Sequence, residues 1–252
     1  MTKKPVLYKI ALLSMLISIL MACSPSANTT PSPQPDNSAS RATETTEATP
    51  VLEASATPDK AMTATSQATS MKEDLQKLVD QEIIQNSDGK YYRVQDLTAN
   101  WAKLGYYHWW PLDRKPTNFA IRADTQWEIA STAADYTKAG CGFIYHEQDP
   151  ANLHLSYLSM DGYVRTIRME KGIFTDMQGK SAGKFKYPAD SAKLMLIVED
   201  KWITFLVNDV VIVHFKDDHL AGGGLSMAVA SGTNKDFGTR CEFKNVELWE
   251  FN

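Results

Sequence analysis

The sequence predicts an all-β fold, an antiparallel sandwich in the second part of the chain. From Lys90 onward, short segments alternate apolar and polar residues, turn residues separate these segments, and helical spacing is rare. Aromatic residues follow the same division: residues 71–252 hold 24 of them, whereas residues 1–70 hold only Tyr8. A packed core is therefore expected only in the second part of the 252 residues.

Residues 1–22 have the pattern of a secretory leader. Lys3 and Lys4 precede an apolar run that is shorter than the roughly 20 residues a membrane span needs. The junction Leu20-Met21-Ala22-Cys23 resembles the bacterial lipobox. The resemblance implies cleavage before Cys23, acyl chains such as palmitate on that residue, and export to the cell membrane or outer membrane, with the domain outside the cytoplasm. The alternative is an ordinary signal peptide in which Cys23 is incidental.

Residues 23–70 are expected to form a disordered tether. Ser, Thr, Pro and Ala make up 33 of the residues in 24–70, so the segment cannot bury enough apolar surface to offset its ordering entropy. Ser70 and Glu73 then match a capping box. Apolar residues follow at helical spacing, namely Leu75, Leu78, Val79 and Ile83. They predict a short amphipathic helix over 71–86, which either packs on the back of the domain or binds a partner.

Turn residues divide the domain over 90–252 into about nine strands. The expected strands are 119–124, 141–146, 152–158, 163–169, 193–198, 202–207, 210–215, 225–230 and 240–251. In the segment 152–158, Leu153, Leu155 and Tyr157 lie on one face by alternation. Tight turns and little helix together favour an antiparallel sandwich or jelly roll.

A recognisable pattern of strands and turns extends over most of this domain. It is carried by Gly140–Tyr145, Asn152–Leu155, Asp161–Tyr163, Trp202–Asp209, Gly223–Met227 and Cys241–Trp249. This pattern of strands and turns resembles that of a concanavalin A-like jelly roll, in its laminin-G-like and 3-keto-disaccharide-hydrolase-like branches. The resemblance implies a surface that binds carbohydrate or, alternatively, an enzyme that hydrolyses a glycoside or a 3-keto-disaccharide.

Two cysteines remain if Cys23 carries lipid. In an exported protein, leftover thiols usually pair. Cys141 and Cys241 each lie in an expected strand, and jelly-roll closure brings early and late strands together. A Cys141–Cys241 disulfide is therefore expected, and two buried free thiols are the alternative.

No catalytic group of residues is expected. Retaining glycosidases of this fold align carboxylates along one strand. The nearest match, Glu147–Asn152, has Asn152 where the acid/base should stand, and Pro150 interrupts the strand. An enzyme is therefore the less favoured interpretation.

No metal or other cofactor is expected either. Two cysteines without a nearby histidine pair do not make a zinc site, and no ordered loop of oxygen ligands predicts Ca²⁺. His214 and His219 flank Asp217 and Asp218, which are interpreted as a solvated turn, with a weak surface metal site as the alternative.

Two sets of residues are candidates for ligand binding. Carbohydrate recognition needs aromatic faces for the C–H surface of the sugar and planar polar groups for its hydroxyls. The first set is the aromatic run Tyr107, Trp109 and Trp110, for which packing in the core is the alternative. The second set is a polar sheet face, for which a solvated surface is the alternative. Its members are Arg122, His146, His154, Arg165 and Arg168.

These observations predict a membrane-anchored, non-catalytic binding module of the cell envelope. Its expected partners are membrane lipid, through Cys23, and a glycan. The net charge of −4 gives no basic field, so nucleic acid is not an expected partner. A structural or protein-interaction module is a further alternative, and the sequence leaves the oligomeric state open.

Overall fold

The structure, a computed structural model, describes residues 58–252. The leader, Cys23 and the predicted tether up to residue 57 lie outside the described residues. Within the described part, one helix precedes thirteen strands. The helix is α1, Pro58–Asp80. The strands are β1 Gly89–Arg93, β2 Leu97–Trp101, β3 Tyr107–Pro111, β4 Phe119–Ile129, β5 Gly140–Asp149, β6 Asn152–Ser159, β7 Tyr163–Glu170, β8 Ile173–Ser181, β9 Ala189–Glu199, β10 Trp202–Val207, β11 Val210–Lys216, β12 Gly224–Ala230 and β13 Thr239–Phe251.

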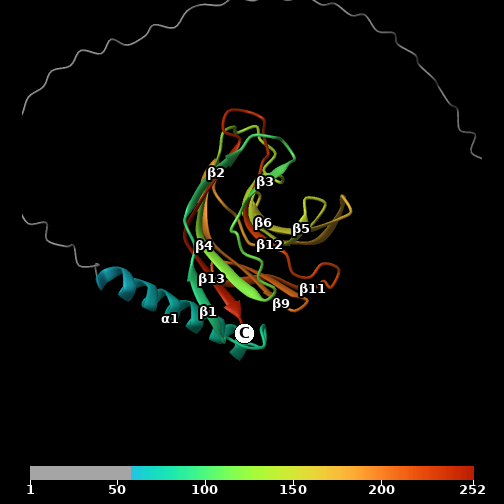
Figure 1. The fold of residues 1–252 in the computed structure, drawn as a ribbon. Helices are drawn as coiled ribbons and strands as arrows, with labels where there is room; N and C mark the ends of the chain where they lie inside the picture. The colour runs from blue at the N-terminus through green and yellow to red at the C-terminus, as the bar shows by residue number, and fades with distance from the viewer. Residues whose placement is uncertain (1–57) are drawn as a thin grey trace, which may run out of the picture. The chain divides into compact units, whose positions relative to one another are not determined.

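The strands form two antiparallel sheets packed face to face, which confirms the predicted all-β sandwich (Figure 1). Sheet A has the order β1-β13-β4-β9-β10-β11, and β2 also pairs with β13. Sheet B has the order β3-β12-β5-β6-β7-β8. The four strands that were not predicted, β1, β2, β3 and β8, all lie at sheet edges. These four strands bury few side chains, since Ala99 is their one buried residue, and their apolar signal is therefore weak.

Alternate residues from both sheets meet in the main core. Phe143 of β5 contacts Phe205 of β10 and Phe243 of β13, with ring centroids 6.4 and 6.1 Å apart. The predicted disulfide is confirmed: Cys141 of β5 is bonded to Cys241 of β13, with Cα atoms 5.9 Å apart. This bond joins sheet B to sheet A across the core.

Helix α1 is longer than the sequence predicts at its start and shorter at its end. It begins at Pro58, whose fixed φ suits the first position of a helix, whereas the composition of 58–70 predicted a tether. It ends at Asp80 in a Schellman motif, because Glu82 adopts a left-handed φ of 59° and Ile83 N donates to Leu78 O over 2.9 Å. Glutamate at the left-handed position gives no sequence signal, so the predicted end fell later.

The apolar face of α1 packs on the outer face of sheet A. Met71, Leu75 and Leu78 are buried against side chains of β4, β9, β10 and β13. In Figure 1 the C-terminus lies beside the end of α1 and β1, where Asn252 N donates to Asp88 O. Among the described residues, no helix combines the length and the apolar character that crossing a bilayer requires.

Candidate functional site

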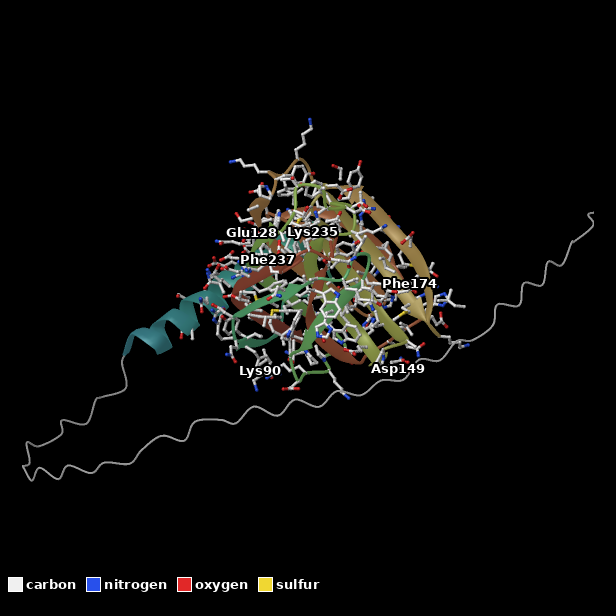
Figure 2. All side chains as sticks on the ribbon, turned by 90° about the horizontal axis from the view of Figure 1, so that it is seen from above. Lys90, Glu128, Asp149, Phe174, Lys235 and Phe237 are labelled. Atoms are coloured by element: carbon white, nitrogen blue, oxygen red, sulfur yellow. A yellow bond between two sulfur atoms is a disulfide. The ribbon has the colours of Figure 1, made fainter. Side chains whose placement is uncertain are left out.

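The outer face of sheet B curls into a concave surface. β3 and β8 lie at opposite edges of this sheet, five strand spacings or about 24 Å apart if the sheet were flat. Yet the rings of Tyr107 and Phe174 are only 6.2 Å apart, and Tyr107 Oη is 3.8 Å from Met169 Sδ. Figure 2 shows Phe174 on the side of the molecule away from α1. We call this surface the concave face.

Two glycines of β5 allow the sheet to curl at its seam with β6. A Cβ atom at Gly142 would lie 2.1 Å from Ser156 O, and one at Gly140 would lie 2.3 Å from Leu158 O. Both contacts are with backbone, which cannot move aside without breaking the pairing of the strands. The two glycines therefore permit a closer approach of the strands than other residues would.

The floor of the concave face is aliphatic and its sides are aromatic. Ile144, Leu153 and Leu155 are almost fully buried there, because Tyr107, Trp109 and Ile167 pack against them. Alternation correctly predicted that Leu153, Leu155 and Tyr157 share a face. The aromatic side chains that lie on this face are Tyr107, Trp109, Tyr157, Tyr163 and Phe174.

Trp109 is held in place by a carboxylate. Its indole Nε1 donates to Glu147 Oε1 over 2.9 Å, and Ser226 Oγ lies 3.4 Å from Glu147 Oε2. The ring of Trp109 also lies 5.8 Å from that of Tyr107. Burial raises the pKa of Tyr107 to about 12, so its phenol is neutral at physiological pH. The site thus presents a fixed indole, a neutral phenol and a carboxylate together.

A bulge explains why Glu147, and not His146, faces Trp109. Simple alternation places His146 on the concave side of β5, together with Ile144. His146 instead has a left-handed φ of 52°, and the pairing of β5 with β6 shifts register beyond Tyr145. This bulge turns His146 inward and brings Glu147 to the concave face. In the sequence, Glu147 stands out only as part of an incomplete glycosidase motif.

Arg165 lies at the rim of the concave face. Its Nη2 donates to Asp161 Oδ2 over 2.6 Å, and its Nε donates to Ser159 Oγ over 3.0 Å. Its guanidinium carbon is 5.5 Å from the ring centroid of Tyr163. Of the predicted polar set, Arg165 is the member that this face contains.

His146, His154 and Arg168 form a separate, buried cluster around Asp217. His154 Nε2 lies 2.9 Å from Asp217 Oδ2, and Arg168 Nη1 donates to both oxygens of Asp217 over 2.9 Å. His154 is fully buried and stacks on Tyr145, because the pairing of β5 with β6 sets these two residues opposite each other. The predicted polar sheet face is therefore replaced here by an internal network.

The charges of this cluster shift its proton equilibria. Burial, together with the neighbouring His154, lowers the pKa of His146 to about 4. Burial acts to raise the pKa of Asp217, but hydrogen bonds from His154, the His219 amide and Arg168 hold it below its usual range. His146 is thus neutral and Asp217 is ionised at physiological pH.

Arg122 lies on the other side of the molecule, on the outer face of sheet A. Its Nε donates to Glu247 Oε2. Its Nη1 donates to Asp74 Oδ2 of α1 over 2.8 Å. Arg122 and Glu247 are both buried, so this pair fastens α1 to sheet A. Arg122 is separated from the concave face by the whole sandwich.

Trp109 and Trp110 point to opposite sides of β3. Trp109 belongs to the concave face, whereas Trp110 packs against the main core and lines an edge cavity. Such opposition follows from the two-residue period of a strand.

Asp217, Asp218 and His219 place one ligand atom each within 4.8 Å of one another. His214 does not join them, since its ring stacks on Trp202 at 4.4 Å. Asp217 is engaged by Arg168, so a cation at this cluster would compete with a guanidinium.

No protein-family model and no curated protein matches this chain. Among solved structures, it is similar to a carbohydrate-binding module from Bacillus subtilis, with 12% identity, 62% of this chain and 94% of that one covered, and a TM-score of 0.46. It is also similar to the exoplasmic domain of VIP36 in a Ca²⁺/Man3GlcNAc-bound form, with 11% identity, 65% and 83% coverage, and a TM-score of 0.43. A β-fructofuranosidase from Aspergillus kawachii has 11% identity and a TM-score of 0.43 over 65% of this chain, which spans only 28% of that enzyme.

Proposed function

We propose that the sandwich domain is a non-catalytic binding module whose concave face takes carbohydrate. The observation that carries this proposal is the bond between Trp109 and Glu147. It holds an indole ring in one orientation beside Tyr107, so little side-chain entropy is lost when a ligand stacks on it. The carboxylate of Glu147 and the pair of Arg165 with Asp161 supply planar polar groups for hydroxyls.

Catalysis has less support than binding. Asp149 is the other carboxylate of the segment 147–152, and it is used by the turn between β5 and β6. Its Oδ1 accepts from Ala151 N over 2.7 Å, and both of its oxygens accept from Asn152 Nδ2. A retaining glycosidase needs two carboxyl groups about 5–5.5 Å apart on opposite sides of the bond that is cut. Glu147 has no such companion within this segment.

A protein partner is the second candidate for the concave face. Phe174 of β8 is 58% exposed beside the aliphatic floor, and its neighbour Ile173, which is 69% exposed, points to the other side of this edge strand and extends the apolar surface around the edge of the sheet. An exposed apolar patch of this kind favours a contact with another protein when it is large. The two candidates predict different losses when aromatic or aliphatic residues are changed.

A glycan array tests the proposal directly. We expect the wild-type domain to bind a defined group of glycans and the Trp109→Ala variant to lose that signal. Tyr106→Ala is the matched control, because Tyr106 is an exposed aromatic residue in the loop before β3. Absence of binding to any glycan, or equal binding by Trp109→Ala, would contradict the proposal. Ile173→Ser should leave glycan binding intact. If Ile173→Ser instead loses binding to a protein partner, the second candidate is favoured.

We also propose that Cys23 anchors the protein to a membrane and displays the domain outside the cytoplasm. The support is the lipobox-like junction that precedes this cysteine. The Cys23→Ser variant should move from the membrane fraction to the soluble fraction. If the variant and the wild type distribute equally, the anchor is wrong.

A further inference from the structure

A cavity of about 490 Å³ lies on the other side of β3 from the concave face. One wall is the segment 93–97 between β1 and β2, and the other is the segment 110–114 at the end of β3. Met227 of β12 contributes the floor. The cavity therefore opens at the edge where the two sheets of the sandwich meet. We call it the edge cavity.

Backbone hydrogen bonds fix both walls of the edge cavity. Val94 N donates to Val246 O over 2.9 Å, which ties the first wall to β13 of sheet A. Leu112 N donates to Leu225 O over 2.9 Å, which ties the second wall to β12 of sheet B. The core and the disulfide hold the two sheets together. The cavity is therefore formed before any ligand arrives.

Two guanidinium groups are oriented at the cavity without using all of their donors. Arg114 lies 3.6 Å from the ring centroid of Tyr92, and its Nη1 donates to Glu250 over 2.7 Å. Arg93 donates through Nη1 to Val246 O and through Nη2 to Asp96, each over 2.9 Å. A guanidinium has five N–H donors, more than these contacts use. Each arginine is thus positioned to donate to a further acceptor.

The remaining lining combines an aromatic ring with carboxylates. Trp110 is half-buried, and the ring of His108 holds it edge-on at 4.8 Å. Asp96 and Asp113 balance the charges of the two arginines. Balanced charge disfavours a strongly charged ligand, whereas planar polar groups around an indole suit hydroxyls and C–H surfaces.

We propose that the edge cavity is a second binding site, which takes a small uncharged sugar such as a monosaccharide or the free end of a chain. This site is independent of the concave face, since Trp109 and Trp110 point to opposite sides of β3. Two sites on one domain would increase the avidity for a glycan that presents several ends.

The indole N–H signals of the six tryptophans provide the test. The ¹⁵N-labelled domain is titrated with glucose, galactose, mannose and fructose, and separately with glucuronate and glucosamine as charged probes. We expect at least one neutral sugar to shift the Trp110 signal in a saturable manner, and the charged probes to do so less. Asp96→Asn and Asp113→Asn should weaken this effect several-fold. Both residues are outside the core, so these variants remain informative if Trp110→Ala fails to fold.

The Trp109→Ala variant separates this proposal from the previous one. A Trp110 shift that persists in Trp109→Ala supports the edge cavity, whatever happens at the concave face. Shifts confined to Trp109 would overturn the edge cavity and leave the concave face standing. No shift of Trp110 with any neutral sugar, or an undiminished shift in both Asp variants, would also overturn it.

Discussion

Glu147 is the residue that gives the concave face its fixed geometry. It is brought there by the bulge at His146 and accepts the indole N–H of Trp109. We expect Glu147→Ala to lower the free energy of unfolding by about 1 kcal/mol, because the hydrogen bond from the indole N–H of Trp109 is lost at a half-buried site. Glu147→Gln keeps an acceptor and should cost less. Urea unfolding measures the free energy of unfolding of both variants, and Glu128→Ala, a change at an exposed glutamate, is the control. Equal stability of Glu147→Ala and wild type would mean that the bond does not hold the ring.

His146 makes the stability of the fold depend on pH. Its pKa is about 4 in the folded protein and near 6.5 when unfolded, so between these values the unfolded chain binds more protons. The free energy of unfolding should therefore fall as pH decreases from 6.5 to 4, by up to roughly 3 kcal/mol. Asp217, whose folded pKa is lowered, adds a further loss only below about pH 4.

The His146→Asn variant isolates this contribution, since asparagine tolerates the left-handed φ at this position. Urea unfolding at pH 7 and pH 4.5 should show a smaller difference for the variant than for the wild type. If the two proteins lose the same stability, another group is responsible.

At the scale of the element, the seam between β5 and β6 gives sheet B its curl. Gly142→Ala should destabilise the domain by about 1–3 kcal/mol or more, because its Cβ would meet Ser156 O at 2.1 Å. Gly179→Ala is the matched control, since a Cβ there meets nothing within 4 Å and Gly179 also lies in a strand of sheet B. Thermal unfolding of the two variants compares them. A Gly142→Ala variant as stable as Gly179→Ala would show that the seam does not require glycine.

Helix α1 depends on a buried ion pair as well as on its apolar face. Arg122→Ala leaves Glu247 buried without its cation, which should cost about 3 kcal/mol or more and loosen α1. Amide hydrogen exchange over 71–80 should then accelerate. Arg240→Ala removes an exposed ion pair from the same sheet and should change exchange little. Unchanged protection of α1 in Arg122→Ala would contradict this role.

At the scale of the whole molecule, the sequence predicted the strands that contribute most of the buried side chains, such as β6, β10 and β12. It also predicted the disulfide, because Cys141 and Cys241 are the two cysteines that remain if Cys23 carries lipid. It did not predict β1, β2, β3 and β8, in which Ala99 is the one buried residue, so their apolar signal is weak. It placed His146 on the wrong face, because a bulge at a non-glycine residue leaves no periodic signal.

The candidate site was predicted only in part, because local alternation does not show which face of a strand packs in the core. The aromatic run identified Tyr107 and Trp109, but the separation of Trp110 depends on which face of β3 the core takes. Both faces of sheet B hold buried side chains. One face packs in the main core, and the side chains of the other face pack against one another across the curved sheet. Alternation along β6 therefore could not show which face was the site. Phe174 contacts Tyr107 because sheet B is curved, and no local sequence pattern predicts this curvature.

The most direct test is calorimetric titration of an oligosaccharide selected on the array into wild-type, Trp109→Ala and Tyr106→Ala domains. We expect Trp109→Ala to raise the Kd by about tenfold or more, as the loss of roughly 1.4 kcal/mol of stacking implies. Tyr106→Ala should keep the wild-type Kd. An unchanged Kd in a folded Trp109→Ala domain would contradict carbohydrate binding by the concave face.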